Sequence, residues 1–347
     1  MEFHTTYSEN NYTIYVNNGI LKETLLKYTN QYEQVFYIID SHVYDLHEKK
    51  FKDFNNVIKV PRGESFKTIE NTMSVIDELL DQNVKRNDLM VVIGGGATGD
   101  GGAFVSSITL RGLDYIHVPT TLLAHDSAIG GKTAINRKQG KNLVGTFYRP
   151  NAVIYDLDFL ETLPEEEVLS GFGEVIKHAM LDGQESIDAL LEKTKNGVDI
   201  KNLNAFILNG IRTKMYYVSV DEKEDNLRKF LNLGHTLGHA LEYAFKLKHG
   251  AAVVLGIIGA LYISNKRYDD TFDIKSFINY VKHIGYDLSP LKNMNATEMI
   301  RYMSSDKKNM RKSYIGYVVL REFGQPELIE ISTSDLETLL NELKAIV

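Results

Sequence analysis

An apolar run meets a glycine-rich turn in Leu89-Met90-Val91-Val92-Ile93-Gly94-Gly95-Gly96-Ala97-Thr98-Gly99-Asp100. Gly94, Gly96 and Gly99 satisfy the spacing G-x-G-x-x-G at the end of a predicted strand. Glycine lets a pyrophosphate approach the backbone N–H groups of a helix N-terminus, where the helix dipole favours an anion. Residues 101–108 are small and apolar enough to form a helix packed closely on a sheet. The stretch therefore predicts a dinucleotide site in an α/β fold, and a glycine turn without a ligand is the alternative.

One feature of the standard dinucleotide fold is missing from the sequence. An acidic residue that binds ribose should end the next strand, about 20 residues further on. That strand instead ends in Pro119, whereas Asp40 follows the earlier run at residues 35–39. If a dinucleotide binds, the sheet is therefore not wound in the standard Rossmann order.

The composition is that of a globular protein with two domains. The 347 residues include 39 Lys+Arg and 46 Asp+Glu, which gives a formal net charge of −7 and no reason to expect a nucleic-acid partner. The longest nearly apolar run, residues 251–264, is too short to cross a bilayer. The first residues have no basic stretch followed by an apolar one, so we expect no signal peptide. We therefore expect a cytoplasmic protein with no membrane partner.

The periodicity of the sequence changes along the chain. Short β-branched or aromatic runs alternate with helical patterns over the first 160 residues, and the chain after Pro164 is mostly helical in pattern. We expect an α/β domain with a mainly parallel sheet over residues 1–160 and an all-α metal-binding domain over residues 161–347. The predicted strands are residues 12–16, 35–39, 57–60, 89–93, 115–118 and 152–155, with a late candidate at 314–320. The predicted helices are residues 65–80, 165–181, 187–193, 200–220, 231–245, 251–265, 274–284 and 336–343.

Histidines and a carboxylate in the second half have the spacing of a metal site. His235 and His239 lie four residues apart and so share a helix face, and His249 precedes the next predicted helix. Glu174 lies one turn before Lys177 among small or apolar neighbours. The chain has no Cys, so three His and one Glu suit a catalytic zinc site with three protein ligands and one open position. Spacing alone leaves open which three are ligands, and surface histidines beside an ordinary ion pair are the alternative.

Glycine-punctuated segments at residues 118–136 and 140–145 look like loops shaped around a ligand. The string Gly130-Gly131-Lys132-Thr133 is not a P-loop, because Asp126 stands where that motif needs its first glycine. Any single Lys or Arg is more often a solvated surface residue. The candidates for binding phosphate or carboxylate are Arg111, Lys132, Lys141, Lys177, Lys214 and Arg228.

The chain resembles the 3-dehydroquinate synthase family over roughly residues 35 to 320. The motifs that carry the resemblance occur in the expected order: Gly63-Glu64-x-x-Lys67, residues 94–100, 119–136, Lys141-Asn142, residues 174–177, 231–242 and His249-Gly250. The resemblance implies an NAD-binding α/β domain, a helical zinc domain and an active site in the cleft between them. It also implies a homodimer, in which Arg111 reaches the neighbouring subunit's site.

The implied reaction belongs to the shikimate pathway. It converts 3-deoxy-D-arabino-heptulosonate 7-phosphate, a phosphorylated sugar acid, to 3-dehydroquinate and phosphate. Its steps are transient oxidation by NAD, phosphate elimination, reduction, ring opening and an intramolecular aldol reaction.

The resemblance also implies roles for individual residues. Zinc, or Co²⁺ in its place, would be held by Glu174, His235 and His249, with His239 as an acid/base residue. NAD would contact Asp40, His42, Glu64, Lys67, Gly94, Gly95, Gly96, Ala97, Thr98, Gly99, Asp100, Thr120, Thr121, Lys132, Lys141, Phe159, Leu160, Glu161 and Thr162. The substrate would contact Arg111, Asp126, Lys132, Asn142, Lys177, Lys214, Arg228, Asn232, His239 and one of Lys307 or Lys308.

The sequence departs from the family pattern at two places. The segment Leu123–Asp126 is one residue shorter than in many members, and Ala251 replaces a residue that is usually polar or acidic near the metal. Three rival functions remain: another sugar-phosphate cyclase, a metal-dependent polyol dehydrogenase, and a non-catalytic nucleotide-binding protein. Asp126 together with the Glu174-x-x-Lys177 pair favours a cyclase over a dehydrogenase.

Overall fold

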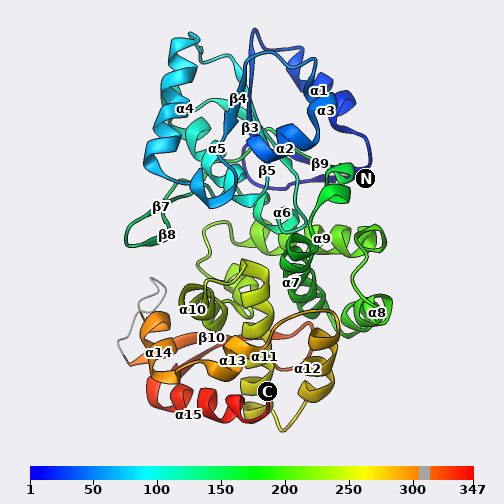
Figure 1. The fold of residues 1–347 in the computed structure, drawn as a ribbon, viewed down its shortest axis with the longest axis vertical. Coiled ribbons are helices and arrows are strands. Elements are labelled where there is room, and N and C mark those ends of the chain that lie inside the picture. The colour runs from blue at the N-terminus through cyan, green and yellow to red at the C-terminus, as the bar shows by residue number, and fades with distance from the viewer. Residues whose placement is uncertain (305–312) are drawn as a thin grey trace. The chain divides into compact units, whose positions relative to one another are not determined.

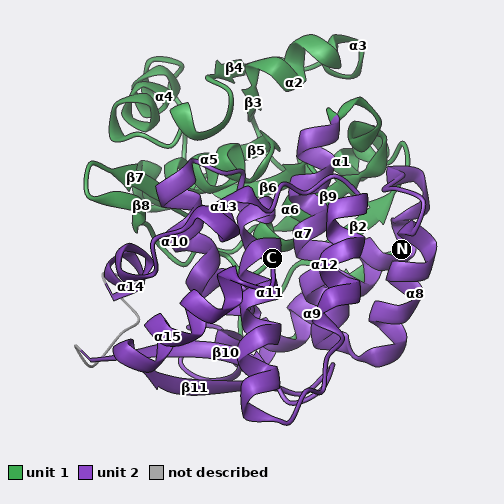
Figure 2. Cartoon of the chain, turned by 60° about the horizontal axis from the view of Figure 1, so that its bottom comes forward, with its two compact units in different colours: residues 1–164 green, residues 165–347 purple. Residues whose placement is uncertain are grey.

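The computed structural model describes residues 1–304 and 313–347, so the predicted substrate contact at Lys307 or Lys308 lies outside the described residues. The chain divides into two compact units, residues 1–164 (unit 1) and residues 165–347 (unit 2), which Figure 2 shows in green and purple. Among the described residues, no helix combines the length and apolar character that a membrane span requires.

Unit 1 is built on a seven-stranded sheet with the order β1-β2-β9-β6-β5-β3-β4 (Figure 1). Every neighbouring pair is parallel except β1 and β2. The strands are β1 (Glu2–His4), β2 (Thr13–Asn17), β3 (Val35–Asp40), β4 (Val57–Val60), β5 (Leu89–Gly94), β6 (Asp114–Pro119) and β9 (Ala152–Asp156). The six strands predicted for this half all form, each within one residue of its predicted ends, so the mainly parallel sheet is confirmed.

Helices cover both faces of this sheet because its strands are apolar on both faces. Phe36 and Ile38 of β3 pack in one core cluster with side chains of α4 and α5, whereas Tyr37 and Ile39 pack in a second cluster with side chains of α1 and α3. The helices of unit 1 are α1 (Leu21–Thr29), α2 (Ser41–Leu46), α3 (Glu48–Phe51), α4 (Ile69–Asp81), α5 (Gly96–Ile108) and α6 (Ala124–Ser127). Short 3₁₀ helices form at η1 (Gly63–Ser65), η2 (Thr109–Arg111) and η3 (Leu157–Thr162).

The strand order explains the displaced acidic residue. Strand β3 pairs directly with β5, so Asp40 at the end of β3 lies next to the glycine turn at the end of β5. The acidic strand precedes the glycine strand in sequence, which departs from the standard Rossmann order as the sequence predicts. Helix α5 begins at Gly96, earlier than the predicted start at residue 101.

A small hairpin in unit 1 is absent from the predicted elements. Strands β7 (Ile135–Arg137) and β8 (Gly140–Val144) pair antiparallel within the region interpreted above as a ligand-shaped loop. Most of their side chains are exposed or half-buried, so the segment has no apolar alternation to indicate strands.

Unit 2 is mainly helical, and all of the helices predicted for it form with shifted ends. Its helices are α7 (Glu165–Asp182), α8 (Gln184–Thr194), α9 (Asn204–Val220), α10 (His235–Phe245), α11 (His249–Arg267), α12 (Ile274–His283), α13 (Ser289–Asn293), α14 (Ala296–Ser304) and α15 (Thr333–Lys344), with η4 (Ile200–Asn202) and η5 (Leu227–Asn232). The late strand candidate forms as β10 (Tyr314–Leu320) and pairs antiparallel with β11 (Pro326–Ser332), which the sequence analysis missed. The described part of unit 2 therefore consists of helices and one β-hairpin.

Glycines let three helices of unit 2 approach closely. A Cβ at Gly256 of α11 would collide with the carbonyl oxygen of Gly234, the residue before α10. A Cβ at Gly250 of α11 would collide with the carbonyl oxygen of Ser170 in α7, and one at Gly173 of α7 would collide with the carbonyl oxygen of Gly250. Because the neighbouring atoms belong to the backbone, no change of side-chain rotamer could make room for a Cβ atom. Only glycine at these positions permits the crossings of α11 with α7 and α10.

In unit 1, a glycine lies in close contact with a buried histidine side chain. The His117 ring on β6 lies against Gly99 of α5, where a Cβ would collide with the imidazole. The ring is 4% exposed, and burial lowers the pKa of His117 to about 4. It is therefore neutral in the folded protein at pH 7.

We expect His117 to make the protein less stable in acid. Between pH 6.5 and 4 the unfolded chain binds a proton at this position that the folded protein does not bind, so the free energy of unfolding falls as pH falls. The full effect of the shift is about 3 kcal/mol. Urea unfolding at several pH values should show a smaller loss of stability in acid for His117→Gln than for the parent. His283 is exposed, so His283→Gln is the control, and its free energy of unfolding should change with pH as that of the parent does. Equal slopes in the parent and His117→Gln would contradict this expectation.

Replacement of Gly256 by alanine tests the close approach of α10 and α11. In an exposed helix this change stabilises by about 1 kcal/mol, but here we expect the collision to lower the free energy of unfolding by about 3 kcal/mol. Gly316→Ala in β10 is the control, because its Cβ would meet Leu328 at an ordinary 3.7 Å. Urea unfolding of both variants gives the comparison, and a Gly256→Ala protein as stable as the parent would show that the helices do not need glycine there.

Candidate active site

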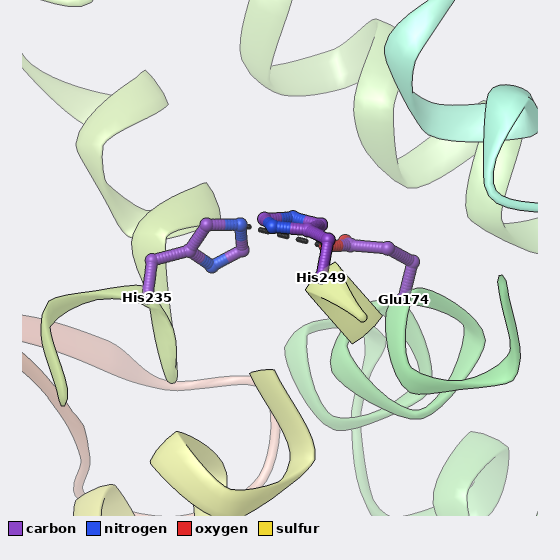
Figure 3. A group of neighbouring side chains, drawn as sticks. All are labelled: Glu174, His235 and His249. Atoms are coloured by element: carbon purple, nitrogen blue, oxygen red, sulfur yellow. Dashed lines mark ion pairs between the residues drawn. The ribbon is translucent and has the colours of Figure 1, made fainter. Parts of the chain in front are cut away.

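Three predicted metal ligands converge in unit 2 (Figure 3). Glu174 lies in the middle of α7, and His235 and His249 are the first residues of α10 and α11. Oε1 of Glu174 lies 3.4 Å from Nε2 of His235 and 3.3 Å from Nε2 of His249. The ligand atoms of all three residues lie within 4.8 Å of one another. Helix packing thus brings together side chains that are up to 75 residues apart in the sequence.

The electrostatics of this group centre on the buried carboxylate. Burial by itself would raise the pKa of Glu174, but the Lys177 ammonium at 2.5 Å and the two imidazoles outweigh it and hold that pKa well below its usual range. Burial lowers the pKa of His235 to about 4. Burial also acts to lower the pKa of His249, but Glu174 and Glu242 outweigh it and raise that pKa to about 9. A metal ion would therefore have to displace a proton from His249.

The donor set fits a zinc ion. Two imidazole nitrogens and one carboxylate oxygen are the ligand types of catalytic zinc sites, which keep a fourth position open for substrate or water. The opposite ring nitrogens have partners of their own: Nδ1 of His235 lies 3.1 Å from the carbonyl oxygen of Leu233, and Nδ1 of His249 lies 3.0 Å from Oε2 of Glu242. Each histidine is thereby held with Nε2 directed to the common centre.

The fourth candidate ligand, His239, lies beside this group. Its ring centre is 5.2 Å from that of His235 and 5.8 Å from that of His249. His239, Glu242 and His249 also satisfy the distance requirement for metal ligands. The family resemblance favours the set with Glu174, and His239 is close enough to that set to act on a molecule bound there.

Several cations predicted to contact substrate are buried in unit 2. Lys177 is 1% exposed, Lys214 8% and Arg228 2%. Lys177 pairs with Glu174, and the Arg228 guanidinium donates to the carbonyl oxygen of Glu222. Ammonium and guanidinium groups also bind phosphate and carboxylate, so the three cations stay candidates for an anionic ligand. Asn232 donates from Nδ2 to Oε1 of Glu224 at 2.7 Å, which adds to the site a carboxylate that the sequence analysis missed.

Most of the NAD residues predicted in unit 1 follow the carboxyl ends of the parallel strands β3, β4, β5, β6 and β9. Asp40 accepts hydrogen bonds from the backbone N–H groups of His42 and Val43 at 2.9 and 3.2 Å. It also accepts from the Thr98 hydroxyl at 3.2 Å and from the Gly63 N–H at 3.3 Å. Asp40 therefore ties together three of the loops in which the cofactor residues lie.

The glycine turn leads directly into α5. The N-cap of that helix is Gly95, whose conformation is extended and which has no side-chain cap. A helix N-terminus without such a cap is suited to a phosphate. The glycines also have packing reasons, since a Cβ at Gly95 would meet the Thr121 side chain at 2.9 Å. Thr120, the predicted NAD contact that precedes Thr121, is buried.

Lys67 links a predicted cofactor residue to a predicted substrate residue. Its ammonium lies 2.7 Å from Oδ2 of Asp100 and donates to Oδ1 of Asn142 at 2.6 Å, and its side chain is 3% exposed. Glu64, three residues earlier, accepts a hydrogen bond from Asn136 on the β7–β8 hairpin at 2.5 Å. The hairpin is therefore attached to the predicted NAD residues.

The remaining predicted residues of unit 1 differ in their burial. Phe159 and Leu160 are buried in η3, and the Phe159 ring stacks on Phe51, so their side chains belong to the core. Arg111 is exposed and has a left-handed backbone with φ of 71°. Asp126 is half-buried in α6. The other exposed residues of the predicted set in unit 1 are His42, Glu64, Lys132, Lys141, Asn142, Glu161 and Thr162.

Comparisons with known proteins show the family of the chain. A family model described as 3-dehydroquinate synthase N-terminal matches residues 57–170, and one described as 3-dehydroquinate synthase C-terminal matches residues 171–309. The chain belongs to the 3-dehydroquinate synthase family. A curated 3-dehydroquinate synthase from Staphylococcus aureus (strain Newman) is 44% identical over 352 residues, which cover 99% of each chain. The family resemblance inferred from the motifs is confirmed.

Solved structures of two other synthases are similar in fold to this chain. A 2-deoxy-scyllo-inosose synthase complexed with carbaglucose-6-phosphate, NAD⁺ and Co²⁺ has a TM-score of 0.86 at 24% identity, covering 99% of each chain. The 2-epi-5-epi-valiolone synthase ValA from Streptomyces hygroscopicus, with NAD⁺ and Zn²⁺ bound, has a TM-score of 0.81 at 19% identity, covering 98% of each chain. The predicted fold class is confirmed.

Glu174→Gln and His235→Ala should each remove the metal. Each change deletes one of three ligands, so we expect zinc affinity and turnover to fall by more than about 100-fold, beyond the effect of losing an outer contact. Metal analysis after dialysis and a phosphate-release assay measure both quantities. Glu167→Gln is the control, because that α7 carboxylate pairs with Lys248 and lies outside the ligand set. Retained zinc with normal turnover in either ligand variant would disprove the assignment.

Proposed function

We propose that the chain converts 3-deoxy-D-arabino-heptulosonate 7-phosphate to 3-dehydroquinate and inorganic phosphate, with NAD and a divalent metal, Zn²⁺ or Co²⁺, as cofactors. The observation that carries the proposal is the Glu174, His235 and His249 group with buried Lys177 beside it, in a chain that is similar to curated 3-dehydroquinate synthases along its whole length. When bound, zinc would polarise substrate hydroxyls as a Lewis acid, and NAD would accept a hydride and later return it.

Residues of unit 2 hold the metal and the anionic groups of the substrate in this proposal. Glu174, His235 and His249 hold the ion with one position open. Lys177, Lys214 and Arg228 supply buried positive charge for phosphate or carboxylate, and Asn232 donates to a substrate oxygen. His239 exchanges a proton with the substrate through a ring nitrogen.

Residues of unit 1 bind the cofactor and add substrate contacts. The backbone N–H groups at the N-terminus of α5 would bind the pyrophosphate of NAD. The Asp40 carboxylate would accept a hydrogen bond from a ribose hydroxyl. Arg111, Asp126, Lys132 and Asn142 complete the substrate contacts, and Lys132 and Asn142 stabilise the leaving phosphate. The other proposed NAD contacts are His42, Glu64, Lys67, Thr120, Thr121, Lys141 and residues 159–162.

The family resemblance extends the proposal to assembly and location. Arg111 is exposed on a left-handed turn, as expected of a side chain that reaches a neighbouring subunit. A homodimer in the cytoplasm is therefore part of the same proposal, and the mass of the purified protein in solution tests the dimer.

An assay of the purified protein with NAD, zinc and 3-deoxy-D-arabino-heptulosonate 7-phosphate tests the reaction. We expect equal amounts of phosphate and 3-dehydroquinate and no net NADH, because the hydride returns to the substrate within each turnover. Phosphate release, dehydroquinate formation and NADH absorbance are followed together. Net NADH from simple polyols without phosphate release would indicate a dehydrogenase instead, and activity with only a different sugar phosphate would indicate a sister cyclase.

A further inference from the structure

We propose that Glu242 is a positioning residue of the metal site, whose carboxylate holds His249 with Nε2 directed at the ion. The inference rests on the metal site of the proposed function. Glu242 lies on α10 and has no role in the residue set inferred from the sequence. It acts through His249 rather than by contact with the substrate.

The geometry places the His249 ring between two carboxylates. Nδ1 lies 3.0 Å from Oε2 of Glu242, and Nε2 lies 3.3 Å from Oε1 of Glu174. The side chain of Glu242 is 12% exposed and that of His249 is 32% exposed, so their contact is partly shielded from water. It reaches this position because His235, His239 and Glu242 follow at i, i+4 and i+7 and so share one face of α10.

The chemistry of the pair sets the tautomer of His249. An ionised carboxylate only accepts hydrogen bonds, so Nδ1 must carry the proton that points to Glu242. When the ring is neutral, its lone pair is then at Nε2, the nitrogen that faces Glu174. Without Glu242, Nδ1 loses this acceptor, and the neutral ring can instead carry its proton on Nε2 facing Glu174, a tautomer that metal binding must then reverse at a cost in free energy.

The two histidine ligands are held in different ways. The backbone carbonyl of Leu233 accepts from His235, whereas His249 faces a full negative charge. A charged acceptor makes the imidazole a stronger electron donor to a metal than a neutral acceptor does. Glu242 also supplies an outer contact from a second helix where Ala251, two residues after His249, has no polar side chain to offer.

A second interpretation is that Glu242 itself binds the ion. It forms a group with His239 and His249 that also satisfies the distance requirement. The two interpretations differ in the size of the effect, because loss of an outer contact costs about 10–100-fold in affinity and leaves the coordination number unchanged.

The experiment compares Glu242→Ala and Glu242→Gln with the parent protein. Zinc affinity is measured on the metal-free full chain by competition with a chelator, and the coordination number is followed by the visible absorption spectrum of the Co²⁺ protein. We expect Glu242→Ala to weaken zinc binding by about 10–100-fold with the Co²⁺ spectrum retained. Glu242→Gln keeps a hydrogen-bond acceptor without the charge, so it should recover part of the loss.

The control is Glu167→Gln, which removes the same charge from the partner of Lys248, the residue before His249. Its zinc affinity should stay within about twofold of the parent value, below the loss expected for an outer contact. Urea unfolding of the metal-free proteins identifies a purely structural role, which would lower stability without changing zinc affinity and would overturn the proposal.

Zinc affinity of Glu242→Ala within about twofold of the parent would also overturn the proposal. So would complete loss of binding with an altered Co²⁺ spectrum, which would make Glu242 a ligand. Failure of the proposed function is distinguishable, because a parent protein that binds zinc but does not convert the sugar phosphate would leave the Glu242 comparison intact. A parent protein that binds no zinc would overturn both.

Discussion

The metal site depends on the close approach of α7, α10 and α11. Gly173 and Gly250 remove the side chains that would separate α7 from α11, and Gly256 does the same between α11 and the start of α10. Each contact is with backbone atoms, so no change of side-chain rotamer could relieve the collision that a larger residue would cause. The predicted ligands come one from each of these helices, and the close approach of the helix backbones lets their ligand atoms lie within 4.8 Å of one another.

A buried carboxylate is the second constraint on this site. Glu174 is 1% exposed, and burying a charge is costly unless opposite charges and hydrogen bonds compensate it. Lys177 and the two imidazoles provide that compensation. The groups that make the burial of Glu174 tolerable are therefore the same groups that we propose for binding the metal and an anionic group of the substrate.

In unit 1 the residues assigned to NAD also hold the loops in place. Asp40 accepts four hydrogen bonds from three segments, and Lys67 connects η1 to α5 and to the β7–β8 hairpin. The hairpin contains Asn142, which we assign to the leaving phosphate. Binding of the cofactor at Lys67 and Asp100 would therefore act on the same contacts that position a substrate residue.

Features that depend on neighbouring residues along the chain could be predicted from the sequence. The six strands of unit 1 follow from runs such as Leu89–Gly94, because a strand apolar on both faces must be buried in a covered sheet. The residue types of the metal site, and the absence of a standard ribose acid after the glycine strand, followed from spacing. The polar β7–β8 hairpin had no such pattern and was missed.

The sequence by itself determined the two kinds of domain, the family and the types of ligand, because burial periodicity and motif spacing are properties of neighbouring residues. Only the tertiary structure decided that Glu242 faces His249, that Glu224 lies on Asn232 and that Lys67 joins Asp100 to Asn142. Those contacts depend on how helices and loops pack, and packing joins residues that no local pattern relates.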